Sequence, residues 1–103
     1  MSVLHITNDN FEREVLNSDK TVIIDFWASW CNPCRMLAPI FEAAAAEAEN
    51  VKFCKVNVDE QPELAQRFEI MSIPTMIVFK NGAIAKKSVG GMSKDQILKL
   101  VED

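Results

Sequence analysis

The sequence predicts a three-layer α/β domain built on a mixed β-sheet. Apolar, β-branched segments alternate along the chain with segments of helical periodicity, which is typical of parallel strands joined by helices. The run 21–28 is apolar almost throughout, as expected for a strand buried on both faces. Asn81-Gly82 separates two later strand patterns and predicts an antiparallel hairpin, because both residues tolerate positive φ. We therefore expect the order β-α-β-α-β-α-β-β-α, with helices on both faces of the sheet.

The first third of the chain is expected to form a short strand, a helix and the buried strand 21–28. Residues 3–6 fit the short strand. Asn8 and Asp9 offer an N-cap for a helix that ends near residue 17, because their side-chain oxygens can accept hydrogen bonds from its first N–H groups. The apolar residues at helical spacing here are Phe11, Val15 and Leu16.

The middle third is expected to form a long helix and a third strand. Residues 32–49 have high helix propensity, notably in the alanine run 43–46. Pro39 lacks a backbone N–H and is expected to kink this helix. Residues 51–59 then fit a strand. The apolar side expected for the helix consists of Met36, Leu37, Ile40 and Phe41.

The last third is expected to form a short helix, the hairpin and a final helix. Pro62 suits the first turn of a helix over residues 62–68. Residues 75–79 and 83–89 are the hairpin strands, and Ser93 caps the final helix. The inner face of that helix is expected to carry Ile97, Leu98 and Val101.

The composition is that of one ordinary globular domain spanning residues 1–103. Apolar residues make up 49% and charged residues 25% of the chain, so a core can form without a structural metal or disulfide. The net charge of −4, without a cluster of Lys and Arg, argues against nucleic-acid binding. No apolar run is long enough to cross a membrane, and the N-terminus lacks the features of a signal peptide. We therefore expect a cytoplasmic protein.

The residues with the clearest chemistry are Cys31 and Cys34. Cys31 directly follows the buried strand, and Cys34 falls in the first turn of the next helix. Free N–H groups at a helix N-terminus favour negative charge, so a thiolate at Cys31 is stabilised there. Cys34 lies three residues further on the same face and can form an internal disulfide with Cys31. The pattern favours redox chemistry.

A zinc half-site is the alternative interpretation of this pair. Zinc would need two further Cys or His ligands, and only His5 and Cys54 remain, each alone inside a predicted strand. We therefore expect no metal site and interpret Cys54 as a small buried apolar residue.

Three further residues stand out against their surroundings. Asp25 lies inside the buried strand, where desolvation should raise the pKa of its carboxyl; a structural and a proton-transfer role are equally open. Lys55 interrupts an apolar strand and, by itself, is better interpreted as a lysine whose ammonium reaches solvent. Pro74 precedes a strand and predicts a turn there, with cis the minority isomer for such bonds.

Five segments, in the right order over essentially the whole chain, resemble the thioredoxin family. The resemblance implies the thioredoxin fold, a three-layer α/β/α arrangement with a five-stranded mixed sheet flanked by four helices. The matching segments are Ile24-Asp25-Phe26 with Trp27-Ala-Ser-Trp-Cys-Asn-Pro-Cys-Arg-Met-Leu-Ala-Pro39, Lys55-Val-Asn-Val-Asp59, Ile73-Pro74-Thr75, Phe79-Lys-Asn-Gly82 and Val89-Gly90-Gly91.

The resemblance also implies roles for individual residues. Cys31 would attack a target disulfide, and Cys34 would resolve the mixed disulfide, leaving Cys31–Cys34 oxidised. Asp25 would assist proton transfer, with Lys55 as its buried neighbour, and Pro74 would be a cis-proline facing the dithiol. The expected substrate-binding surface consists of Trp30, Asn32, Pro33, Ile73, Pro74, Val89, Gly90 and Gly91.

The same resemblance implies partners rather than a bound cofactor. The expected partners are disulfide-containing proteins and thioredoxin reductase, a flavoprotein that uses FAD and NADPH, while the chain itself is expected to be a monomer. Asn32 departs from the family, which typically has glycine at this position, and leaves the redox poise open. It also leaves open a thioredoxin-fold binding module, or a specialised protein with one dedicated partner.

Overall fold

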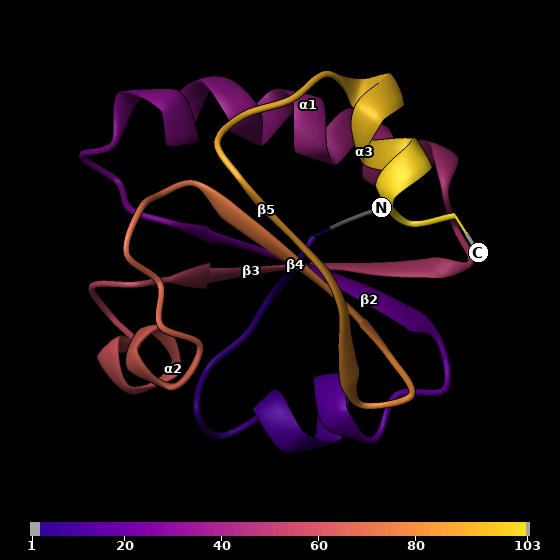
Figure 1. Cartoon of the computed structure of the whole chain (residues 1–103), viewed down its shortest axis with the longest axis horizontal. Coiled ribbons are helices and arrows are strands. Elements are labelled where there is room, and N and C mark those ends of the chain that lie inside the picture. The colour runs from indigo at the N-terminus through magenta and orange to yellow at the C-terminus, as the bar shows by residue number, and fades with distance from the viewer. Residues whose placement is uncertain (1–2, 103) are drawn as a thin grey trace.

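The structure is a computed structural model that describes residues 3–102, arranged as one sheet between two helical layers (Figure 1). The ends of the predicted domain, Met1, Ser2 and Asp103, lie outside the described residues. The elements in chain order are β1 (Leu4–His5), the π-helix η1 (Glu12–Leu16), β2 (Thr21–Trp27), α1 (Asn32–Glu47), β3 (Val51–Asn57), α2 (Pro62–Arg67), β4 (Thr75–Lys80), β5 (Ala83–Val89) and α3 (Lys94–Leu100).

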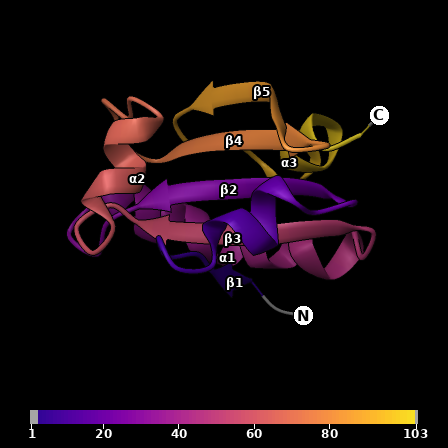
Figure 2. The same ribbon diagram turned by 90° about the horizontal axis from the view of Figure 1, so that it is seen from below.

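The described strands form a five-stranded mixed sheet in the order β1-β3-β2-β4-β5 (Figure 2). β1 and β2 pair in parallel with β3, whereas β4 runs antiparallel to β2 and β5 antiparallel to β4. This confirms the predicted combination of early parallel strands and a terminal hairpin. β2 is the central strand, and its residues 22–26 are all buried, as the apolar run predicts.

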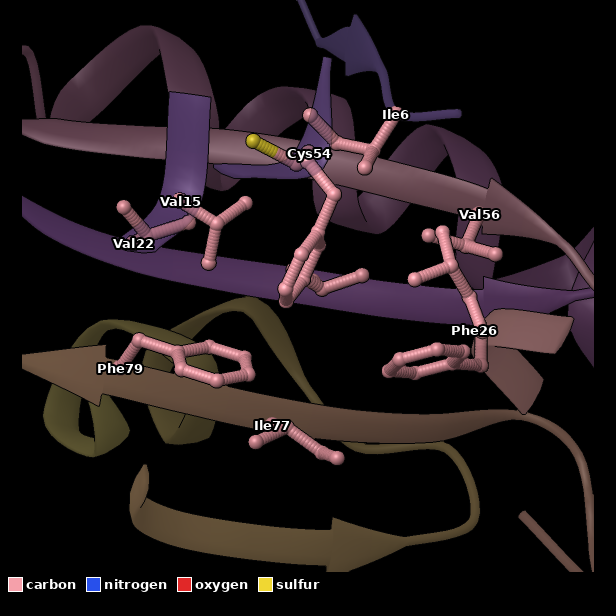
Figure 3. Close-up of a cluster of buried hydrophobic side chains, with 11 residues drawn as sticks. Ile6, Val15, Val22, Phe26, Cys54, Val56, Ile77 and Phe79 are labelled. Carbon is pink, nitrogen blue, oxygen red and sulfur yellow. The ribbon is translucent and has the colours of Figure 1, made fainter. Parts of the chain in front are cut away.

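Helices cover both faces of the sheet. α1 and α3 lie on one face, and α2 and η1 on the other (Figure 1). The core under α1 and α3 includes Ile23, Leu37 and Ile97. The core on the opposite face is the cluster drawn in Figure 3, and it contains Cys54 at 0% exposure, as predicted for a small buried residue.

The first helix differs from its prediction at its start. Asn8 and Asp9 belong to a turn, and the N-cap residue of η1 (Glu12–Leu16) is Phe11, which makes no side-chain capping hydrogen bond. Asn8 Nδ2 instead donates a hydrogen bond to Glu63 Oε1 at 2.8 Å, which connects this turn to α2. The expected N-cap is therefore wrong, because the Asn8 side chain bonds across to α2 and η1 begins only after Phe11.

Several expected boundaries are also too wide. β1 is limited to two residues, and α1 ends at Glu47 instead of residue 49. β3 ends at Asn57, whose Oδ1 accepts hydrogen bonds from the N–H groups of Asp59 and Glu60 and so turns the chain. Met36, expected on the apolar side of α1, is 68% exposed, whereas Leu37 and Phe41 are buried.

The predicted hairpin turn and the predicted N-cap of the last helix are both confirmed. Asn81 and Gly82 have φ values of 51° and 78°, as the hairpin requires. The Ser93 side chain accepts a hydrogen bond from the N–H of Gln96, whose own side chain returns to the Ser93 N–H. Ser93 therefore starts α3 with a capping box.

Candidate active site

Cys31 and Cys34 lie at the N-terminus of α1, immediately after the central strand. They are joined by a disulfide, with Cα atoms 5.2 Å apart. Cys31 is the N-cap of α1, and its Sγ accepts a hydrogen bond from the N–H of Cys34 at 3.2 Å. On reduction the same N–H group and the positive end of the helix dipole would stabilise a thiolate at Cys31.

The two cysteines are packed tightly enough that a target must be held in position to react. Cys31 is 5% exposed and Cys34 is 2% exposed. They pack with buried Ala28 and with the partly buried side chains of Trp27, Val58 and Ile73. Disulfide exchange requires direct approach of one sulfur to another. The surface around Cys31 therefore decides which disulfides can reach it.

Two further loops complete the wall around the dithiol. The Ile73–Pro74 peptide bond is cis, as the family resemblance implies, and the Ile73 carbonyl oxygen lies 3.8 Å from Cys31 Sγ. The Pro74 carbonyl oxygen accepts a hydrogen bond from the N–H of Gly90 at 2.8 Å. The start of α1, the Ile73–Pro74 turn and the segment at Gly90, which are distant in the sequence, thus meet beyond the C-terminal end of β2.

Apolar side chains and two hollows surround this meeting point. Trp30 is 66% and Val89 63% exposed, so both present large apolar side chains to solvent. The hollow of about 180 Å³ is lined by Trp30, Val58, Ile70, Met71, Ser72 and Ile73. The hollow of about 260 Å³ is lined by Pro33, Met36, Leu37, Ile40, Gly91 and Met92.

Asp25 is buried in the sheet beneath α1. It is 2% exposed and lies opposite Lys55 on β3 and Met76 on β4. Strand alternation places Asp25 on the same face as Ile23, which is the face that α1 covers. Desolvation raises the pKa of the Asp25 carboxyl to about 7, and the positive charge of Lys55 opposes that rise. Its Oδ1 has no hydrogen-bond partner among residues 3–102.

Lys55 neighbours Asp25 in the sheet register but is only partly buried. Its Nζ lies 4.4 Å from the centroid of the Trp27 ring, where it makes a cation–π contact. Lys55 is thus a neighbour of Asp25, as the family resemblance implies. Its side chain is only partly buried, which agrees with the expectation of an ammonium that reaches outward. The expectation that Lys55 is buried is wrong.

Sequence reasoning missed three residues that shape the site. The Asp59 carboxylate accepts a hydrogen bond from Trp30 Nε1 at 2.8 Å and orients this exposed ring. The Thr75 hydroxyl donates to the Ser72 carbonyl at 2.6 Å and closes the turn before β4. The Arg35 guanidinium donates to the carbonyl of Ser29 and to the side chain of Asn32. A signal for Asp59 was available, because it follows β3 where the adjacent parallel strand β2 also ends.

The residues considered for zinc do not come together. Among residues 3–102, no group of three or more His, Cys, Asp and Glu side chains is placed to hold a metal ion. Cys54 belongs to the cluster on the opposite face, and burial raises the pKa of its thiol to about 12. In the described part of the chain, no helix is long and apolar enough to cross a membrane.

The raised pKa of Asp25 predicts an unusual pH dependence of stability. The carboxyl binds its proton more tightly in the folded state than in the unfolded state, where its pKa is near 3.8. The free energy of unfolding therefore falls as pH rises from about 4 to about 7, by about 4 kcal/mol at about 1.4 kcal/mol per pKa unit. Asp25→Asn should remove this loss and be more stable than the wild type at pH 8, by urea denaturation.

Glu14→Gln provides the matched control. Lys52 lowers the pKa of the Glu14 carboxyl, so its contribution has the opposite sign and is lost as pH falls through that lowered pKa. Equal stability of wild type and Asp25→Asn at both pH 4 and pH 8 would contradict a desolvated carboxyl at this position.

Known proteins similar to this chain are thioredoxins. The sequence matches the family model described as Thioredoxin over residues 2–103. The thioredoxin of Alicyclobacillus acidocaldarius subsp. acidocaldarius is 46% identical over 93% of this chain and 91% of its own length. The thioredoxin of Rickettsia bellii is 44% identical over 96% of this chain and 95% of its own length.

Solved structures give the same result for the fold. The crystal structure of the Malassezia sympodialis thioredoxin Mala s 13 superposes with a TM-score of 0.86 at 40% identity. The superposition covers 97% of this chain and 88% of that chain. The predicted five-stranded mixed sheet with four flanking helices is confirmed. The chain therefore belongs to the thioredoxin family, and it is a thiol–disulfide oxidoreductase.

Proposed function

We propose that this protein reduces disulfides in other proteins, with Cys31 as the nucleophile and Cys34 as the resolving thiol. The observation that carries this assignment is the position of Cys31 Sγ, which caps α1 and accepts the N–H of Cys34. A cysteine at a helix N-terminus has a stabilised thiolate, and the thiolate is the attacking species in exchange.

The reaction consists of two exchanges. The Cys31 thiolate attacks one sulfur of the target disulfide, a mixed disulfide forms, and the other target sulfur leaves as a thiolate. The Cys34 thiolate then attacks Cys31 Sγ, the mixed disulfide breaks, and the second target sulfur leaves. Two electrons pass to the target, and Cys31–Cys34 ends oxidised, the state that the structure contains.

Asp25 is proposed to move the proton that the second exchange requires. Cys34 must lose its thiol proton before it attacks, and a carboxyl whose pKa is about 7 can accept a proton near neutral pH. Asp25 lies on the sheet face under α1, which carries Cys34 in its first turn. The positive charge of Lys55 tunes this carboxyl by opposing its desolvation.

The proposed substrate surface is formed by segments next to Cys31, by the cis-proline loop and by the end of β5. Trp30 and Val89 offer exposed apolar area, and the two hollows beside them can receive side chains of a target. Gly90 and Gly91 carry no side chain, and a Cβ added to either would meet no atom within 4 Å, so another backbone can approach closely. An extended target segment would therefore be held by Trp30, Asn32, Pro33, Ile73, Pro74, Val89, Gly90 and Gly91.

The cycle needs an electron donor from outside the chain. We propose thioredoxin reductase, which would pass electrons from NADPH through its FAD to the Cys31–Cys34 disulfide. We place the cycle in the cytoplasm, a reducing compartment in which the Cys31–Cys34 pair can be returned to the dithiol. We propose that residues 1–103 form one domain and that the protein acts as a monomer.

Turnover with a reductase tests the proposed function. With NADPH, a thioredoxin reductase and insulin as the disulfide substrate, the protein should support NADPH oxidation and insulin reduction. A variant with Cys31→Ser and Cys34→Ser should support neither reaction while keeping its fold. No turnover with several reductases would contradict the reductase role, and unchanged biological function of the double variant would favour a binding module.

The order of the two cysteines can be tested by trapping. Cys34→Ser should accumulate a mixed disulfide between Cys31 and the target, because attack remains possible while resolution does not. Non-reducing electrophoresis and mass spectrometry of the linked peptides identify the attached cysteine. The matched variant Cys31→Ser should trap at least tenfold less. Abundant adducts on Cys34 of that variant would reverse the assignment.

A further inference from the structure

Arg35 makes two side-chain hydrogen bonds to the segment of residues 29–32, which contains Cys31, in addition to its ordinary helical backbone bond. Its backbone N–H donates to the Cys31 carbonyl at 3.1 Å. Its guanidinium donates from Nη1 to the Ser29 carbonyl at 3.0 Å and from Nη2 to Asn32 Oδ1 at 2.9 Å. One side chain on α1 thus holds the chain both before and after the nucleophilic cysteine.

The contacts of Arg35 leave its positive charge uncompensated. Both guanidinium acceptors, a carbonyl and an amide oxygen, are neutral. Within residues 3–102, no carboxylate lies within ion-pair distance of Arg35. None of its three bonds involves a sulfur atom, so reduction of the disulfide removes no donor or acceptor.

Asn32 supplies one of the two anchors. The family typically has glycine at this position, and a glycine there would offer the guanidinium no side-chain acceptor. The amide is short and exposed, and its Oδ1 meets the guanidinium from the residue three positions later on α1. Asn32 therefore gives the Arg35 guanidinium a side-chain acceptor that glycine would lack.

We propose that Arg35 is a positioning residue for Cys31: held by Ser29 and Asn32, it fixes residues 29–32 and keeps a positive charge there that increases the fraction of Cys31 present as thiolate. This inference rests on the proposed role of Cys31 as nucleophile. Asp25 on β2 and Lys55 on β3, beneath α1, and Asp59, bonded to Trp30, are the other charged groups around the dithiol.

The test measures how fast iodoacetamide alkylates Cys31 in the reduced protein between pH 5 and pH 10. Peptide mapping assigns the product to Cys31. Arg35→Gln should slow alkylation at pH 6 by about two- to fivefold, as expected for an exposed charged contact, with equal rates above pH 9. Arg35→Lys keeps the charge but cannot donate to both Ser29 and Asn32 as a guanidinium does. Its alkylation rate should lie between those of Arg35→Gln and the wild type.

A double-mutant cycle isolates the link to Asn32. Asn32→Gly alone should slow alkylation at pH 6, whereas Asn32→Gly added to Arg35→Gln should cause little further change, because the shared contact is already lost. Arg13→Gln, at an arginine that is exposed and bound to Glu14, is the matched control and should behave as the wild type.

Two results would overturn the inference. One is an alkylation profile of Arg35→Gln that matches that of Arg13→Gln at every pH. The other is a double variant whose loss equals the product of the two single losses, which would make the residues independent. Because alkylation needs neither a target protein nor a reductase, its outcome is distinct from a failure of insulin reduction.

Discussion

The structure depends on one constraint, the burial of β2 on both faces of the sheet. The strand must be apolar to be buried in this way, and its residues 22–26 are all buried. Asp25 is the one ionisable residue of that stretch, and the surrounding core raises the pKa of its carboxyl to about 7. The same strand ends at Trp27 and delivers the chain to Cys31. The strand that buries this acid is thus also the strand that leads to the dithiol.

The chemistry of the dithiol follows from elements that converge at this end of β2. The first turn of α1 supplies N–H groups, the cis-proline loop brings the Ile73 carbonyl to within 3.8 Å of Cys31 Sγ, and Gly90 joins that loop to the end of β5. No single element suffices, because the helix stabilises charge while the loops limit access. Arg35 adds a cation and a brace from the helix itself.

The sequence predicted most of the fold because its strongest patterns coincide with buried elements. The apolar run of β2, the Asn81-Gly82 turn and the Ser93 cap all lie where expected. The N-cap prediction failed because a tertiary contact competes with the local preference: the Asn8 side chain bonds to Glu63 of α2. Met36 was expected on the apolar side of α1 but is exposed. Side-chain contacts between distant or flexible residues, such as Trp30 with Asp59, have no periodic pattern and only the structure shows them.

The central claim is that Asp25 is a buried acid linked to the dithiol, and it can be tested directly. The measurement is an NMR titration of the Asp25 side-chain carboxyl in the oxidised protein and again in the reduced protein. The Asp25 carboxyl should titrate with a pKa of about 7 while the disulfide is intact, and differently once Cys34 carries a thiol. A carboxyl that titrates near 3.8, or identically in both redox states, would contradict it.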